Sequence, residues 1–252
     1  MSKIIKYEIK IILLKPYVFT LLLINLLYSY YILSSEIILG VSDTAPFSGW
    51  SFGKYMGSST LWAFILSMFI LVYSRTGKKK VSILTDMSGF SPKKLNMIRS
   101  LIVAGFFLLN CILIFILGCV FLQALFGVTY IGSYVVDFLL ITIPCLFILI
   151  GFGTLAGNIH PVFIYAFIVL IMAVSFISSA KIGAGGQLMY NIDTVGANYY
   201  EAVSSLMENF NASETPFVIN GDYVVSRIVY AFLGIVAFVV GYVRIGRKQK
   251  YT

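Results

Sequence analysis

The sequence predicts an all-α membrane protein with six transmembrane helices, on three observations. Hydrophobic residues make up 60% of the 252 residues and charged residues 11%, whereas about 25% of a typical soluble domain is charged. Six apolar runs each approach the ~20 residues of helix that cross a bilayer core. Basic residues are concentrated on one side of these runs, the asymmetry typical of membrane proteins. We therefore expect a single transmembrane domain over residues 1–252 in the cell membrane.

Residues 2–15 are expected to form an amphipathic helix that lies in the membrane interface. Helical periodicity places three lysines on one face and three isoleucines on the opposite side: Lys3, Lys6 and Lys10, against Ile5, Ile9 and Ile12. Such a helix directs its basic side toward the lipid headgroups. The Lys15-Pro16 step then ends this helix and starts the first span, because proline is tolerated in the first turn of a helix.

The apolar runs place the six spans at about 16–35, 58–75, 100–123, 135–154, 161–180 and 223–243. The fourth run contains Asp137 near its start and Pro144 inside it, and membrane helices tolerate such a proline. Two large segments, 36–57 and 181–222, are expected on the outer side. Within the second, residues 197–210 form either an amphipathic helix on the outer leaflet or an ordinary surface helix, and the sequence leaves both readings open.

The basic residues orient the chain in the membrane. The N-terminal segment, the connector at 75–99 and the C-terminal tail together hold 15 of the 18 Lys and Arg residues. These three segments share one side of an even-span protein, and eight of the ten acids fall on the other side. Short loops rich in Lys and Arg are retained in the cytoplasm. Both termini and the connector are therefore predicted to be cytoplasmic.

The connector at 75–99 contains a second amphipathic stretch. Val81, Leu84 and Met87 share one face over about two helical turns. Gly89 follows where the end of a helix favours a left-handed residue. The sequence therefore predicts a short cytoplasmic helix between the second and third spans.

A new helix is expected to start directly after this short one. Ser91-Pro92 has the residue types of an N-cap and a first helical position, which leaves Phe90 at the corner between the two helices. An exposed apolar corner at Met87 and Phe90 favours the docking of a partner. The other reading is a membrane-surface helix held by anionic lipid, and local features favour the two about equally.

The sequence lacks the mid-span charge of ion-coupled carriers, the HExxH motif of zinc proteases and the P-loop of ATPases. No charged residue lies near the middle of a span, where ion-coupled carriers usually place one. HExxH and the P-loop pattern GxxxxGK[ST] are missing, so any ATP hydrolysis would take place in another chain. The three cysteines lie within apolar runs, and His160 has no acid or cysteine close by in sequence. We therefore expect no metal and no cofactor in this chain.

The remaining polar groups of the spans are amides and hydroxyls: Asn25, Ser67, Asn110, Gln123, Thr142 and Ser175. One reading is a path for an amphipathic substrate, with Asn25 and Asn110 as its candidate residues. The favoured reading is hydrogen bonding between helices, worth about 0.6 kcal/mol per bond in membranes. Arg227, one turn into the last span, is expected to reach the outer interface or to meet an acid such as Asp222.

Together these features resemble the permease subunits of type-2 ATP-binding-cassette (ABC) exporters. In that family the connector consists of an apolar-rich helix, a proline with small or polar neighbours, and a basic residue that opens the third span. The matching stretch is ILTDMSGFSPKKLNMIRSL, with Ser91-Pro92, Lys93 and Arg99 in the expected places. The chain departs from the pattern at Val81-Ser82, where the family often has a glutamate. Its size is similar to that of small permeases in peptide-antibiotic export and immunity systems.

The resemblance implies a transport subunit that is not itself an enzyme. Two permeases, identical or different, would pair around a central path, and separate cytoplasmic ATPases that bind ATP and Mg²⁺ would drive export of an amphipathic substrate. The ATPase contact would lie in the connector, at Val81, Leu84, Met87, Phe90, Ser91, Pro92 and Lys93. Membrane lipid is a further expected partner, and nucleic acid is not. The alternative hypothesis is a non-transporting assembly or sensor protein that binds a cytoplasmic partner.

Overall fold

The computed structural model describes residues 2–38, 46–76, 92–127, 130–160, 162–179 and 221–248. Within these ranges nearly every residue is helical and none is in a strand, which confirms the predicted all-α class. In chain order the elements are α1 (Ser2–Ile12), α2 (Pro16–Ile32), the π-helical turn η1 (Leu33–Ile37), α3 (Gly49–Thr76), α5 (Pro92–Phe126), α6 (Ile131–Ile159), α7 (Val162–Ser179) and α10 (Gly221–Lys248).

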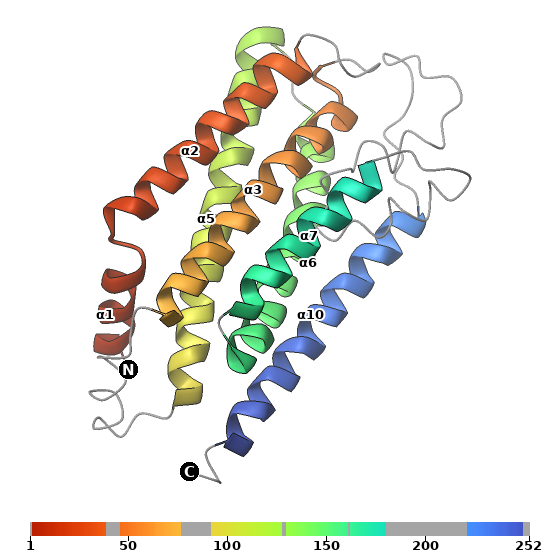
Figure 1. Ribbon diagram of the computed structural model, residues 1–252. Helices are drawn as coiled ribbons and strands as arrows, with labels where there is room; N and C mark the ends of the chain where they lie inside the picture. Colours follow the sequence, from red (N-terminus) through yellow and green to blue (C-terminus); the bar gives the residue numbers. More distant parts are fainter. Residues whose placement is uncertain are drawn as a thin grey trace.

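The long helices form a bundle in which successive helices run in opposite directions (Figure 1). Helices α2, α5 and α7 run toward one end of the bundle, whereas α3, α6 and α10 run toward the other. As a result, α1 and the C-terminal end of α10 lie at the same end, the lower one in Figure 1. We call this the terminal end of the bundle.

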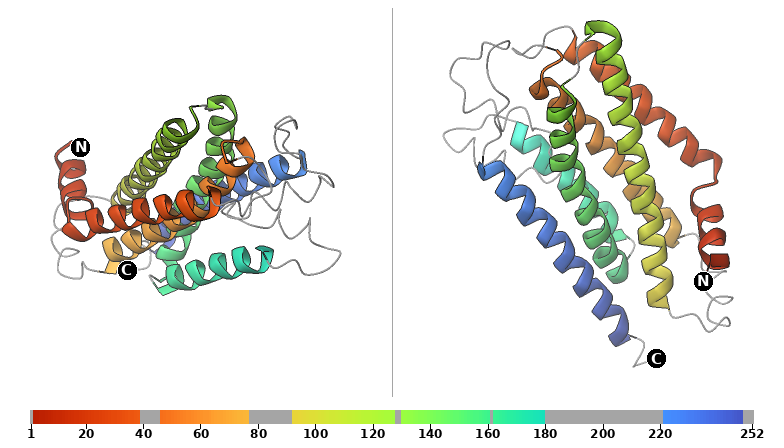
Figure 2. Two further views of the ribbon diagram at one scale, coloured as in Figure 1. Left: turned by 90° about the horizontal axis from the view of Figure 1, so that it is seen from above. Right: turned by 180° about the vertical axis from the view of Figure 1, so that it is seen from behind.

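Helix α1 is joined to α2 by a short turn at residues 13–15 and runs in a different direction from it (Figure 2). The turn closes the last turn of α1 with hydrogen bonds from Leu13 N and Leu14 N to Ile9 O, at 2.8 and 3.4 Å. Pro16 then starts α2, so the predicted break at Lys15-Pro16 is confirmed. The position of α1 in a membrane interface stays a prediction.

Among the described residues, five helices are long and apolar enough to cross a membrane: Pro16–Ser35, Gly49–Ser74, Leu95–Phe126, Ile131–Ala156 and Tyr223–Val243. Each overlaps a predicted span, and the chain is a multi-pass membrane protein. The run predicted at 161–180 is also helical, from Val162 to Ser179. Its apolar stretch among the described residues, Val162–Ser175, is shorter than those of the other five.

Helix α3 begins at Gly49, nine residues before the span predicted at 58–75. It therefore includes part of the segment 36–57, which the sequence places in an outer loop. Three glycines and Lys54 interrupt the apolar run at this point, so hydropathy sets the boundary of the span too late. Packing against neighbouring helices overrides this weak local pattern.

Aromatic side chains fill the bundle at the start of α3. Phe52 stacks on Tyr134 of α6, with ring centroids 4.1 Å apart, and Tyr55 Oη donates a hydrogen bond to Ile114 O of α5 at 2.8 Å. Both Phe52 and Tyr55 are fully buried. A Cβ added to Gly118 of α5 would lie only 2.6 Å from the Tyr55 ring, so a glycine is what lets this ring pack against α5.

Helices α6 and α10 make the closest packing of the bundle, along a line that we call the glycine seam. A Cβ at Gly151 would overlap the backbone of Gly234, and a Cβ at Gly234 would overlap the backbone of Phe147. Further along, Asn158 Nδ2 donates to Gly241 O at 3.1 Å. Small residues allow membrane helices to approach this closely, so that van der Waals contact between backbones holds the pair.

Candidate functional site

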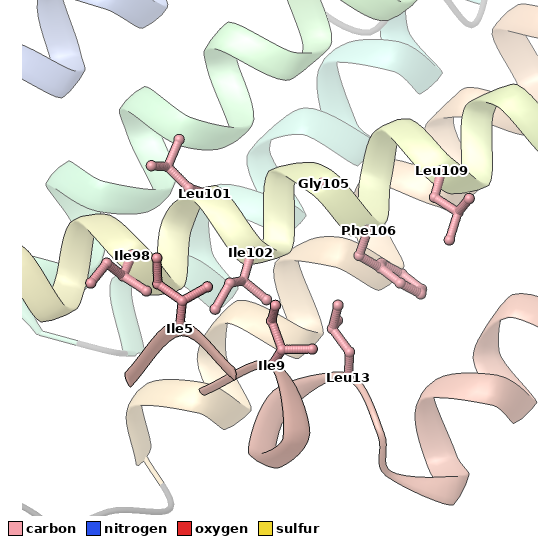
Figure 3. Close-up of a pocket in the computed structure, with 9 residues that line it drawn as sticks. All are labelled: Ile5, Ile9, Leu13, Ile98, Leu101, Ile102, Gly105, Phe106 and Leu109. Carbon is pink, nitrogen blue, oxygen red and sulfur yellow. The ribbon is translucent and has the colours of Figure 1, made fainter. Parts of the chain in front are cut away.

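The terminal end of the bundle has an apolar groove between α1 and α5. Its volume is about 340 Å³, and its lining is apolar throughout: Ile5, Ile9, Leu13, Ile98, Leu101, Ile102, Gly105, Phe106 and Leu109. Ile5 and Ile9 of α1 and Leu13, the first residue after α1, recur every four positions, so they share one face, and they point toward α5 (Figure 3). No atom lies within 4 Å of the position that a Cβ would take at Gly105, so the groove is open there.

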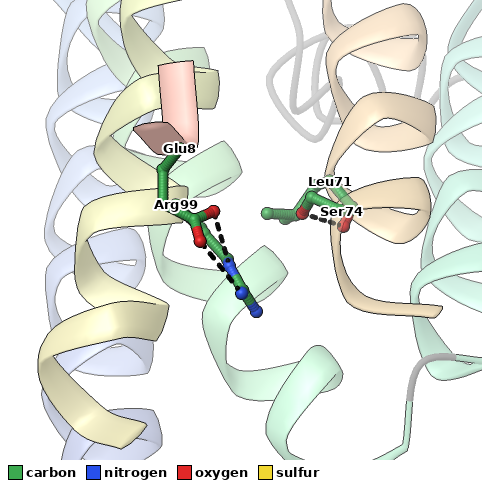
Figure 4. Close-up of polar contacts among 4 residues, drawn as sticks. All are labelled: Glu8, Leu71, Ser74 and Arg99. Atoms are coloured by element: carbon green, nitrogen blue, oxygen red, sulfur yellow. Dashed lines mark hydrogen bonds and ion pairs between the residues drawn. The ribbon is translucent and has the colours of Figure 1, made fainter. Parts of the chain in front are cut away.

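A bidentate ion pair holds α1 against α5 next to this groove. Arg99 Nε donates to Glu8 Oε2 at 3.0 Å, and Arg99 Nη2 donates to Glu8 Oε1 at 3.2 Å (Figure 4). Glu8 is 2% exposed and Arg99 7%. Two parallel hydrogen bonds between charged groups fix orientation as well as distance, so the pair sets the rotation of α1 on α5. We call the ion pair and the groove together the α1–α5 junction.

The sequence does not predict the pairing of Glu8 with Arg99, because 91 positions separate the two residues. In the sequence, Arg99 is the last basic residue of the connector at 75–99, and Glu8 is an acid among lysines. The sequence nevertheless indicates that Glu8 needs a partner. Helical periodicity puts Glu8 on the same side of α1 as Ile12 and near Ile5, and an acid on an apolar face requires a partner when it is buried.

Most residues expected to contact an ATPase lie outside the described residues: Val81, Leu84, Met87, Phe90 and Ser91. Pro92 and Lys93 are the first two residues of α5, so the predicted helix start at Pro92 is confirmed. Arg99 belongs to the same matched stretch, and its buried side chain connects this stretch to α1. The contact of the connector with an ATPase stays a prediction.

The two residues proposed for a substrate path, Asn25 of α2 and Asn110 of α5, lie in direct contact. Asn25 Nδ2 donates to Asn110 Oδ1 at 3.2 Å, and both side chains are buried. Asn25 Oδ1 and Asn110 Nδ2 make no hydrogen bond within the part of the chain that the structure describes. The geometry is that of a hydrogen bond between helices, the reading that the sequence favours. A role in a substrate path stays a prediction.

Two further hydrogen bonds show how hydroxyls of the spans are satisfied, one within a helix and one between helices. Ser67 Oγ donates to Ala63 O at 2.7 Å, one turn back in α3, and the hydroxyls of Ser100 and Thr154 join α5 to α6 at 3.1 Å. Both arrangements satisfy hydroxyls that would be costly to bury unpaired. Among the described residues, no three His, Cys, Asp or Glu side chains gather into a possible metal site.

The expectation that Arg227 reaches the outer interface or meets an acid such as Asp222 stays a prediction. Within the described residues, the Arg227 side chain is buried in the bundle. It is 2% exposed, and its Cζ lies 4.4 Å from the centre of the Tyr223 ring and 5.3 Å from that of Tyr230. Arginine over an aromatic face gains a cation–π attraction that strengthens when water is excluded. The tyrosines one turn before it and nearly one turn after it therefore help to keep this cation inside the protein.

The α1–α5 junction is the best-defined candidate site in the described part of the chain. It joins the N-terminal helix to the helix that follows the basic connector, through one buried ion pair and two facing apolar surfaces. A scan against protein-family models and searches of curated proteins and of solved structures found no match to this chain. The functional proposal below is therefore based on this junction and on the sequence features given above.

Proposed function

We propose that this chain is the transmembrane permease subunit of a type-2 ABC exporter. Six helices cross the membrane, with both termini and the connector at 75–99 in the cytoplasm. The subunit pairs with itself or with a second permease. A separate cytoplasmic ATPase that binds ATP and Mg²⁺ drives the pair, which exports an amphipathic substrate such as a peptide antibiotic, a drug or a lipid-like molecule.

The observation that carries the proposal is the buried ion pair between Glu8 and Arg99. Arg99 is the eighth residue of α5 and the last residue of the connector that would contact the ATPase. A push on the connector acts on the start of α5 and, through the ion pair, on α1 as well. Rigid-body movement of a helix transmits motion without any local chemistry, as a permease driven by a separate motor requires.

The arrangement of the helix ends supports the same proposal. Helix α3 ends and α5 begins at the terminal end of the bundle, where α1 and the end of α10 also lie (Figure 1). The N-terminal segment, the connector and the tail hold 15 of the 18 basic residues. A cluster of positive charge at one end of a membrane protein favours a cytoplasmic position for that end, where an ATPase would bind.

The test is to purify the tagged chain from its native membrane and to identify the proteins that accompany it. We expect a P-loop ATPase whose hydrolysis rate changes when the permease is bound. Phe90→Asp should abolish this co-purification, because a carboxylate cannot enter an apolar contact without desolvation. Phe90→Leu is the matched control and should retain it.

Two other outcomes of this experiment would contradict the proposal. If Phe90→Asp binds the ATPase as well as the wild type and stimulates hydrolysis equally, the connector is not the contact. If the native membrane gives no ATPase but another cytoplasmic protein, the chain is a non-transporting assembly or sensor protein.

A further inference from the structure

We propose that the groove between α1 and α5 binds an anionic phospholipid, with one acyl chain in the groove and the headgroup phosphate on Lys6 and Lys10. This site does not depend on transport, since it needs only the two helices and a membrane. Three properties of the groove lead to the proposal: its lining and opening, its length, and the charge beside it.

The lining and the opening fit a hydrocarbon chain. All nine lining residues are apolar, so a polar ligand would lose its hydrogen bonds to water without replacement. Leu101 and Leu109 are each 50% exposed, which means that the groove opens on the outside of the bundle. In a membrane that outer surface faces lipid, so an acyl chain can enter from the side.

The length of the groove fits one leaflet. From Ile98 to Leu109 the lining of α5 extends for about 16 Å, at 1.5 Å per residue. Half of a hydrocarbon core of ~30 Å is about 15 Å. The groove begins seven residues into α5, close to the terminal end of the bundle. It therefore matches the depth of a single acyl chain in the leaflet on that side.

The charge beside the groove favours an anionic headgroup. Lys6 and Lys10 follow the groove residues Ile5 and Ile9, and each is therefore turned about 100° around α1 from the lining. Both lysines are exposed. Glu8 would repel a phosphate, but its carboxylate is paired with Arg99. The exposed side of α1 next to the groove is thus net positive, and a basic residue near the membrane surface attracts anionic lipid.

Photo-crosslinking tests this site in the full-length protein reconstituted in nanodiscs. The probes are phosphatidylglycerol and phosphatidylcholine, each with a diazirine in one acyl chain. Mass spectrometry of the digested protein then locates the cross-links. We expect cross-links from phosphatidylglycerol to concentrate on residues 5–13 and 98–109. An even spread over the outer faces of α2 and α10, or equal cross-linking by both lipids, would overturn the proposal.

Two sets of variants separate the acyl-chain contact from the headgroup contact. Gly105→Phe fills the open part of the groove and should remove most cross-links, whereas Gly132→Phe, which also has open space around it, should not. Gly105→Leu is the second choice should Gly105→Phe not fold. Lys6→Gln with Lys10→Gln should lower the preference for phosphatidylglycerol by about 30-fold, and Lys54→Gln at the other end of the bundle should leave it unchanged.

A second copy of the chain is the competing occupant of the groove. Leu101→Cys would then form a disulfide between two copies in the membrane under mild oxidation. That result would assign the groove to a dimer contact and would overturn the lipid proposal. Persistence of lipid cross-links in Gly105→Phe at the wild-type level would overturn it as well.

Discussion

The α1–α5 junction and the glycine seam attach helices to the bundle in opposite ways. In the seam, Gly151 and Gly234 bring the backbones of α6 and α10 into contact, and no side chain intervenes. In the junction, Glu8 and Arg99 hold two helices together through long side chains, next to a groove of about 340 Å³. One contact is closed and the other is partly open.

This difference indicates which parts of the protein can move. A contact between backbones has no side-chain rotamers through which it could rearrange. At the junction, the ion pair holds α1 to the start of α5 and the groove leaves open space beside them, so the two segments can move together while the pair stays intact. Under the proposed function, α6 and α10 form a rigid unit, whereas α1 and the start of α5 take up the motion.

The largest expected effect is in the glycine seam. In Gly234→Leu, a side chain must enter space that the backbone of Phe147 occupies, so α10 has to separate from α6. We expect little folded protein, measured as the monodisperse fraction in size-exclusion chromatography in detergent. Gly132→Leu is the control, because a Cβ there meets no atom within 4 Å, and it should fold normally. If Gly234→Leu gives the wild-type elution profile and melting temperature, the seam is not a rigid contact.

The next largest effect is expected in the junction. Arg99→Met leaves the carboxylate of Glu8 buried without its partner, and breaking a buried ion pair costs about 3–5 kcal/mol. The double variant Glu8→Met with Arg99→Met should recover most of this loss, because apolar residues often replace a buried pair without cost. Melting temperatures of the wild type, both single variants and the double variant complete the cycle. Additive losses would show that the two residues do not interact.

The smallest expected effect compares two glycines of α5. Gly105→Ala should stabilise the protein by up to about 1 kcal/mol, because alanine favours a helix and its Cβ meets no atom in the groove. Gly118→Ala should destabilise it, since its Cβ would lie 2.6 Å from the ring of Tyr55. The shift in melting temperature checks both. A loss of stability in Gly105→Ala would mean that the groove is closed in the membrane.

The sequence predicts the class of fold well, because an apolar run long enough to cross a bilayer has few other structures available to it. The ends of a helix are harder to predict from the sequence where polar residues interrupt its apolar run. Hydropathy does not indicate the first turns of α3, because Lys54 and the glycines around it lower the local hydrophobicity. Phe52 and Tyr55 are buried there by helices that come later in the chain. Pro92, in contrast, marks the start of α5 correctly, because its chemistry is local.

The candidate site is only partly predictable for the same reason. Arg99 stands out in the connector motif, but its partner Glu8 is 91 residues away. Asn25 and Asn110 are each recognisable as polar residues inside a span, but the sequence does not show that they contact each other. Which glycines pack against which helix is likewise decided by the rotation of α6 and α10. Each of these features depends on how helices are turned toward one another, which a periodic pattern leaves open.

The turn at residues 13–15 limits how far α1 can travel. Three residues reach at most about 10 Å when fully extended, so a larger displacement of α1 would drag Pro16 and the first turn of α2 with it. Under the proposed function, so short a connection would pass a movement of α1 directly on to α2. Glycines inserted into this turn would then uncouple the two helices and leave α2 in place when α1 moves.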